Sequence, residues 1–176
     1  MAAGSRTDTR DVWKYSQDVL GGSQVIKHYP NAYKLISWIL KKEGCKGAMP
    51  FGKEMAVYME SINDAIHKGI DKKHIVDFAI GIRNKNGSGK SKKIRLIEAK
   101  LNSKDTENIE TNELRIKIND TMSILREEGI TIESGAVILI SDGSKAEQNR
   151  SKLSRRLANS FDVFTISRFY SEFFKK

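Results

Sequence analysis

The chain contains a single cysteine, Cys45, among its 176 residues. One cysteine excludes an internal disulfide and also a zinc site built from cysteine ligands. The three histidines, His28, His67 and His74, lack the spacing of a metal-binding pair. No apolar run is long enough to cross a membrane, and the first residues lack the apolar core of a signal peptide. We therefore expect a cytoplasmic protein with no membrane partner.

Positive charge is in excess. The chain has 31 Lys and Arg against 22 Asp and Glu, which gives a net charge of +9 and a pI near 9.6. Such an excess favours an anionic partner, with nucleic acid as the first expectation and an anionic membrane surface as the second. The length fits one domain, which we place at residues 11–176 after a flexible N-terminus at residues 1–10.

Two apolar runs carry charged residues at positions where burial is expected. Residues 74–82 contain Asp77, and residues 93–101 end with Glu98 and Lys100. A charge inside a buried strand costs several kcal/mol unless a partner compensates it. One divalent cation would compensate both carboxylates and explain the three charges together.

The polar, glycine-rich segment between the two runs predicts an antiparallel hairpin. If the turn is symmetric, paired residue numbers sum to about 175, so Asp77 lies opposite Glu98 at a Cβ separation of roughly 5 Å. Lys100 then points to the same face as Glu98. The other face is expected to carry apolar residues of the core: Val76, Phe78, Ile80, Ile97 and Ala99. An alternative is an edge hairpin with an Asp77–Lys100 ion pair and an exposed Glu98.

At these residues the chain resembles the PD-(D/E)XK nuclease superfamily, with Asp77 as the first acid and Glu98-Ala99-Lys100 as the E-x-K element. The resemblance spans residues 52–141 and implies a Mg²⁺-dependent endonuclease, acting mostly on DNA, in which Mn²⁺ can substitute. It implies that Asp77, Glu98 and the Ala99 carbonyl bind the metal and that Lys100 acts on the water or the phosphate. The chain departs from the family pattern because Val76 stands where a proline is usual. It also shows no strand in residues 69–74, before the Asp77 run.

Along the chain, the pattern predicts alternating helices and strands. Residues 136–140 are apolar without alternation, which favours a strand covered on both faces and parallel to a neighbour. We expect an α/β fold with a mixed central sheet flanked by helices on both faces, restriction endonuclease-like. The helices are expected at residues 11–20, 31–43, 53–68, 105–128, 144–159 and 168–176, and the last strand at 162–167. The aromatic residues near the C-terminus fit a core or a homodimer interface.

A third acid is expected from the predicted helix at residues 53–68. Glu54 lies at the border of its apolar stripe, whereas Glu60 lies on the solvent side. The resemblance also favours Glu54, because many family members place a metal-site Glu just after a glycine near the start of such a helix. We therefore assign Glu54 as a catalytic and metal-binding candidate. The alternative is that Glu54 only compensates the helix dipole.

Basic residues away from the three charges are candidate phosphate contacts. Four crowd the hairpin tip (Lys85, Lys90, Lys92 and Lys93), and others follow one predicted helix (Lys145, Arg150, Lys152, Arg155 and Arg156). Such contacts position nucleic acid without reading its sequence. The segment 87–91 resembles the end of a P-loop, but it lacks the first glycine and is followed by a strand, so we reject a nucleotide site there.

The sequence thus predicts a metal-dependent endonuclease. Two alternatives stay open: a non-catalytic nucleic-acid-binding module on the same fold, and a basic subunit of a larger assembly.

Overall fold

Seven strands form one open, mixed sheet in the part of the chain that the computed structural model describes, which is residues 11–68, 70–86, 91–102, 106–126, 130–157 and 161–176. The sheet order is β2-β3-β4-β5-β6-β7, with β1 paired beside β4. The strands are β1 (Trp13–Tyr15), β2 (Tyr33–Leu35), β3 (Met55–Tyr58), β4 (Phe78–Asn84), β5 (Lys92–Lys100), β6 (Thr131–Ile140) and β7 (Asp162–Thr165).

The sheet changes from antiparallel to parallel at β5. Strands β2, β3, β4 and β5 pair antiparallel, whereas β5, β6 and β7 pair parallel. The β4–β5 hairpin pairs Phe78 with Ile97 and Ala79 with Leu96, so the predicted register is confirmed. β6 is parallel to β5 as predicted, but it begins at Thr131 and is longer than expected.

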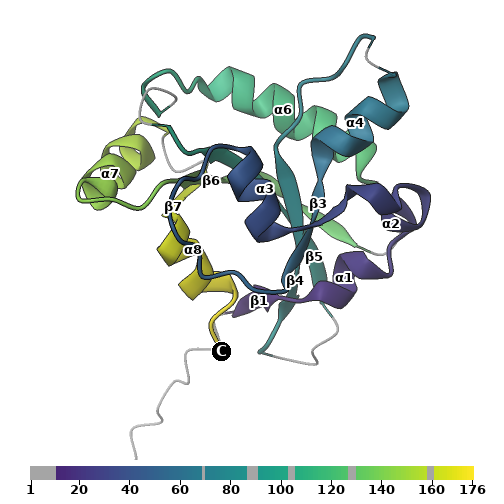
Figure 1. Cartoon of the computed structure of the whole chain (residues 1–176), viewed down its shortest axis with the longest axis horizontal. Coiled ribbons are helices and arrows are strands. Elements are labelled where there is room, and N and C mark those ends of the chain that lie inside the picture. The colour runs from purple at the N-terminus through teal and green to yellow at the C-terminus, as the bar shows by residue number, and fades with distance from the viewer. Residues whose placement is uncertain (1–10, 69, 87–90, 103–105, 127–129, 158–160) are drawn as a thin grey trace, which may run out of the picture.

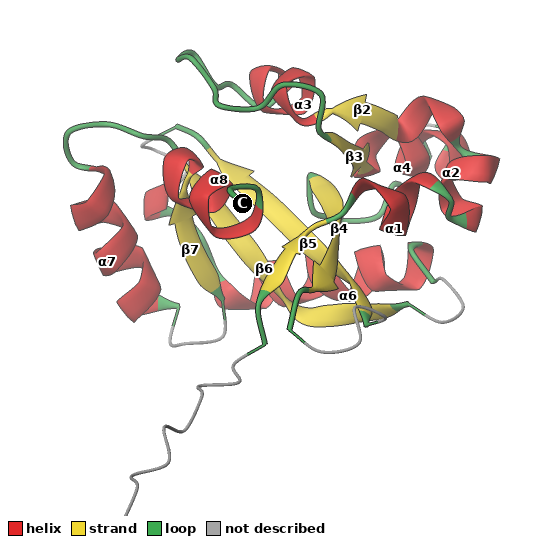
Figure 2. Ribbon diagram, turned by 90° about the horizontal axis from the view of Figure 1, so that it is seen from below, coloured by secondary structure: helices red, strands yellow, loops and turns green. Residues whose placement is uncertain are grey.

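Helices cover both faces of the sheet (Figure 2). On one face, α3 and α8 pack on residues such as Phe78 and Ile97, and on the other, α4 and α6 pack on residues such as Ala79 and Leu96. The helices are α1 (Gln17–Gly21), α2 (Gln24–His28), α3 (Ile36–Lys42), α4 (Met59–His67), α6 (Thr111–Ile124), α7 (Ala146–Arg156) and α8 (Ile166–Phe173), with a 3-10 turn at Pro30–Ala32. The α/β fold with a mixed sheet is therefore as predicted.

The first three helix predictions are wrong in their N-terminal parts. Residues 13–15, 33–35 and 55–58 are short strands, and the α-helices begin only after them. Pairing with neighbouring strands overrides the helix-like spacing of these apolar residues, because Ala56 and Val57 are completely buried between β2 and β4. β3 therefore lies beside β4 as the strand that the sequence did not reveal before Asp77.

The C-terminal elements agree with the sequence predictions to within a few residues. The aromatic residues there belong to the core, since Phe161, Phe169 and Phe173 are buried. Val76 differs from expectation: it precedes β4, donates its N–H to Thr121 Oγ1 (3.0 Å) and packs in the α6 cluster rather than with Phe78. The predicted flexible N-terminus, residues 1–10, lies outside the described residues. Among the described helices, none has the length and apolar character required to cross a membrane.

Candidate active site

The charged residues of the hairpin meet where β4 begins and β5 ends. Asp77 directly precedes β4, and Glu98 and Lys100 are among the last residues of β5. Because Phe78 pairs with Ile97, the register puts Asp77 across from Glu98. This end of the hairpin lies beside α6 and α3, at the top of Figure 1. The structure thus brings three predicted residues to one end of the sheet.

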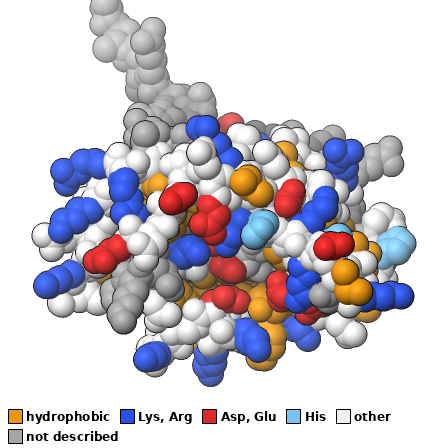
Figure 3. Space-filling model, turned by 90° about the horizontal axis from the view of Figure 1, so that it is seen from above, with side chains coloured by type: hydrophobic (Ala, Val, Ile, Leu, Met, Phe, Trp, Pro, Cys, Tyr) orange, Lys and Arg blue, Asp and Glu red, His pale blue; other side chains and the backbone are white. Residues whose placement is uncertain are grey.

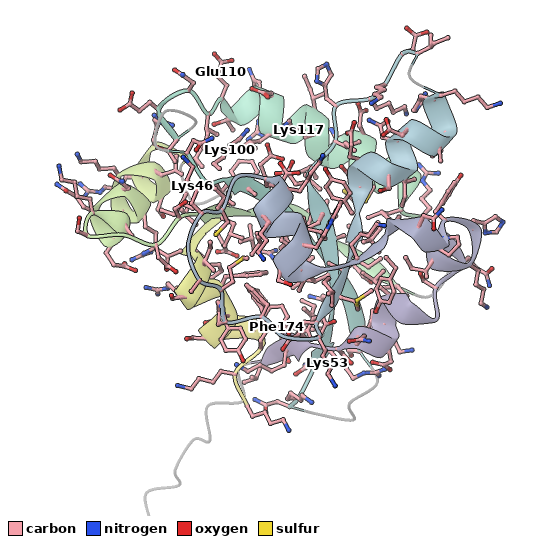
Figure 4. All side chains as sticks on the ribbon, in the orientation of Figure 1. Lys46, Lys53, Lys100, Glu110, Lys117 and Phe174 are labelled. Atoms are coloured by element: carbon pink, nitrogen blue, oxygen red, sulfur yellow. The ribbon has the colours of Figure 1, made fainter. Side chains whose placement is uncertain are left out.

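Glu98 is a buried carboxylate that two lysines share. Its side chain is 1% exposed, and its Oε1 accepts hydrogen bonds from Lys100 Nζ (2.9 Å) and Lys117 Nζ (2.6 Å). Its Oε2 is buried and has no hydrogen-bond partner among the described residues. Lys117 comes from α6, and Figure 4 shows it in the same region as Lys100. The alternative with an exposed Glu98 is therefore wrong.

Asp77 is bound to the backbone of the neighbouring strand. Its Oδ2 accepts the N–H of Ala99 (2.6 Å), which lies between Glu98 and Lys100. Burial, followed by the nearby Glu98 and Glu43 carboxylates, raises the pKa of the Asp77 carboxyl well above its ordinary value. The described residues show no Asp77–Lys100 ion pair, and the attraction of Lys117 only partly offsets the rise in the Asp77 pKa.

Lys100 stays protonated although it is partly buried. Burial opposes its charge, but the attraction of Glu98 and the hydrogen bond to it are stronger together, so the pKa of Lys100 is raised. An ammonium group held beside two carboxylates is available to contact a phosphate oxygen or a water molecule.

A third carboxylate near Asp77 is Glu43, which the sequence analysis gave no role. Glu43 caps the C-terminus of α3, and its Oε1 accepts the hydroxyl of Tyr58 (3.1 Å). Glu43, Tyr58, Glu60 and Asp77 line one cavity of about 370 Å³. Burial, with Glu98 and Glu60 adding to it, raises the pKa of Glu43 against the opposing Tyr58 hydrogen bond. The sequence signal was a carboxylate at a helix C-terminus, where the helix dipole disfavours it.

Glu54 is not at this site. It precedes β3 rather than lying in a helix, and its Oε2 accepts the N–H of Gly52 (2.6 Å). Tyr58 is the residue of β3 that pairs with Phe78, beside Asp77. Glu54 lies four residues before Tyr58, so it is roughly 13 Å from Tyr58 along the chain direction. The helical-wheel argument failed because residues 55–58 are extended.

The donor set fits a cation that keeps much of its water. Within the described ranges, no group of three or more His, Cys, Asp or Glu side chains is close enough to form a metal cage. Asp77 and Glu98 are instead a pair of repelling carboxylates, and one oxygen of Glu98 lacks a partner. Mg²⁺ uses one or two carboxylates and keeps several waters, so it suits this pair better than a fully protein-bound metal would.

The basic residues predicted at the hairpin tip lie at the wrong end of β5 for this site. Lys92 begins β5 and Lys100 ends it, which separates them by roughly 26 Å. Lys93 binds Glu133 (2.6 Å), Lys85 and Lys92 are exposed, and Lys90 lies outside the described residues. On α7, Arg150 pairs with Glu147 (2.7 Å), and Arg155 contacts the backbone of its own helix.

A basic residue that is near the site is Lys145. It lines a cavity of about 300 Å³ together with Lys100, Asn102 and Asn149. A second cavity, of about 250 Å³, shares Asn102 and continues to Lys46. On the face seen in Figure 3, Lys and Arg side chains lie mostly around the rim and acidic side chains lie nearer the middle.

No protein-family model, curated protein or solved structure matches this chain. The superfamily membership that the sequence resemblance implies therefore stays a prediction.

Proposed function

We propose that this chain is a Mg²⁺-dependent nuclease that hydrolyses phosphodiester bonds of nucleic acid, with DNA as the first expected substrate. The observation that carries the proposal is the convergence of Asp77, Glu98 and Lys100, in which one buried Glu98 oxygen has no partner within the described part of the chain. A buried, incompletely paired carboxylate is costly for a fold and marks a place where a ligand completes the arrangement.

The fold supports the same proposal. The resemblance to the PD-(D/E)XK superfamily requires a strand before the Asp77 strand, and β3 occupies that position, paired to β4. It also requires a mixed sheet between helices, which the chain has. A restriction endonuclease-like core is therefore the finer fold assignment that we propose.

Each residue of the site has a role that its contacts favour. Asp77 and Glu98 would hold the metal, with the Ala99 carbonyl as a further candidate ligand. When bound, the metal would supply a Lewis acid that activates water and neutralises charge on the phosphate. Lys100 holds a water molecule or a phosphate oxygen. Lys117 keeps Glu98 in position from α6.

Glu43 replaces Glu54 as the third acid in this proposal. It is hydrogen-bonded to Tyr58 and lines the cavity that Asp77 also lines. We assign it to hold a water molecule at the edge of the site, since a carboxylate accepts hydrogen bonds from water without needing direct contact with the metal.

The test is a cleavage panel of plasmid, linear duplex, junction, single-stranded DNA and RNA, with Mg²⁺, Mn²⁺ or EDTA. The parent is expected to cleave at least one substrate with Mg²⁺ or Mn²⁺ and none with EDTA. Asp77→Asn is expected to remove that cleavage, whereas Glu54→Gln, at the far end of β3, is expected to keep it. Equal cleavage by Asp77→Asn and the parent would overturn the proposal.

One observation favours a non-catalytic binding module on the same fold. Lys100 and Lys117 already neutralise Glu98, as they would in a purely structural ion pair. Thermal unfolding followed at increasing Mn²⁺ separates the two functions. A metal site predicts a melting temperature that rises with metal in the parent and not in Glu98→Gln, whereas a binding module predicts no rise in either.

A further inference from the structure

Trp38 is a large aromatic side chain left on the surface beside the candidate active site. It lies on α3 and is 44% exposed, and Leu35, three residues earlier, is 41% exposed. The opposite side of α3 is completely buried through Ile36 and Ile39. The outward side of this helix thus carries an apolar surface that the described part of the chain does not cover.

A chain of contacts joins Trp38 to the site. Its ring packs edge to face on Tyr58, with centroids 5.5 Å apart and the planes at 82°. Tyr58 donates its hydroxyl to Glu43 and lines the same cavity as Asp77. Trp38 is therefore fixed in orientation and lies one aromatic ring away from that cavity.

Basic groups surround this aromatic surface. Lys34 Nζ lies 5.4 Å from the centroid of the Trp38 ring, and Lys42, at the end of the same helix, lines the cavity with Asp77. An exposed cation–π contact is weaker than the stacking of a nucleobase on an aromatic ring. A base can therefore displace the Lys34 ammonium from the ring, and the ammonium remains near enough to contact the phosphate of the same nucleotide.

We propose that Trp38 is a stacking platform for an unpaired nucleobase beside the scissile phosphate, so that the preferred substrate carries single-stranded nucleotides at this position. The placement beside a scissile phosphate rests on the proposed nuclease function, whereas binding of the base to Trp38 does not require cleavage. Unpaired bases are needed because the faces of a base inside a duplex are already covered by its neighbours. The net charge of +9 and the two lysines favour a nucleic acid over an apolar protein partner.

The test uses the full chain with Asp77→Asn, which binds without cutting, and with Trp13→Phe, which leaves Trp38 as its single tryptophan. A short oligothymidylate is expected to quench the Trp38 emission, and a duplex of equal length is expected to quench it much less. A second measurement uses the Asp77→Asn chain with Trp13 intact and follows the fluorescence anisotropy of a labelled oligothymidylate. Adding Trp38→Ala to this chain is expected to weaken single-strand binding about tenfold. Trp38→Phe is expected to keep part of the affinity.

Leu35→Ala is the matched control, because it removes an equally exposed side chain that cannot stack on a base. It is expected to leave the affinity unchanged. The inference would be overturned if Trp38→Ala bound the oligothymidylate as tightly as the protein that retains Trp38. It would also be overturned if the duplex quenched the Trp38 emission as strongly as the single strand. Loss of self-association in Trp38→Ala without loss of oligonucleotide binding would assign the surface to a second copy of the chain instead.

The outcome is separate from that of the cleavage panel. Quenching without any cleavage in the parent would leave the stacking platform standing and remove the nuclease proposal. Metal-dependent cleavage without quenching would support the nuclease proposal and remove the stacking platform.

Discussion

β5 carries charged side chains at both of its ends, but the ion pairs that these side chains form differ between the two ends. At the hairpin end, Lys93 binds Glu133 (2.6 Å) and Arg95 binds Asp162, with Glu133 also within 3.9 Å of Arg95. Lys93 and Arg95 thus each have an acid from another strand. At the other end, Glu98 is buried, two lysines share one of its oxygens, and the second oxygen has no partner among the described residues.

The difference separates charges that serve the fold from charges that point to a function. Exposed ion pairs contribute about 0–1 kcal/mol. The pairs at the hairpin end are partly exposed, and folding alone gives each of these charges a partner. Glu98 is buried, and one of its oxygens has no hydrogen-bond partner among the described residues. It lies next to Asp77, whose pKa is raised, and this arrangement lowers the stability of the folded state. Such a cost is expected where a ligand completes the arrangement.

The largest effect is expected from Glu98→Gln, compared with the same change at Glu133. Glu98→Gln is expected to reduce cleavage by roughly a thousandfold or more, because it removes the charge that faces Asp77, Lys100 and Lys117. Glu133→Gln is expected to leave the rate within about twofold, since Glu133 and its partner Lys93 lie at the other end of β5 from the site. Initial rates under single-turnover conditions measure both. Similar losses in the two variants would break the distinction between the two ends.

The next effect separates the two lysines that bind Glu98. Lys100→Met is expected to reduce the cleavage rate by about a hundredfold or more, because the proposed mechanism assigns Lys100 to the water or the phosphate. Lys117→Met is expected to cost about tenfold, because Glu98 keeps its bond to Lys100 and loses only one charged hydrogen bond. The rate constants at saturating Mg²⁺ measure this order. A larger loss from Lys117→Met than from Lys100→Met would exchange the two roles.

The smallest effect is on stability and concerns Glu43. Because burial raises the pKa of Glu43, the folded state binds its proton more tightly than the unfolded state does. This contribution is fully present below the unfolded pKa of a Glu, about 4.3, and is lost as pH rises through the higher folded pKa. Glu43→Gln does not ionise, so its stability relative to the parent is expected to increase with pH across that range.

Urea unfolding in EDTA at a series of pH values measures this difference. Glu54→Gln provides the matched control, because the same substitution is made at the far end of β3. A Glu43→Gln difference that stays flat with pH would show that burial does not disfavour the charge there.

The register of the β4–β5 hairpin could be predicted from the sequence, because it depends on residues close together in the chain. A symmetric turn and period-two alternation predicted that paired numbers sum to 175, and Phe78 with Ile97 has that sum. The helix α6 was also predicted, because its apolar residues recur with helical spacing. The core of β6 was predicted because residues 136–140 are continuously apolar, as in a strand covered on both faces.

The rest of the site depended on contacts that no local pattern contains. Residues 55–58 fit a helical stripe as well as a strand, and pairing with β2 and β4 decided between them. Because residues 53–68 were predicted as one helix, Glu54 was assigned to the site and Glu43 was overlooked. Glu43 is connected to the site through its hydrogen bond with Tyr58. Lys117 was missed because only the packing of α6 on β5 brings it to Glu98.

The confinement of Asp77, Glu98 and Lys100 to a single hairpin has a consequence for how this protein folds. Adjacent antiparallel strands with a short connection form early, since closing a small loop loses little chain entropy. The three groups are therefore expected to acquire their mutual geometry before the α6 crossover and the parallel strands are added. Transient opening of α7, β7 or α8 would then leave the mutual geometry of these three residues intact.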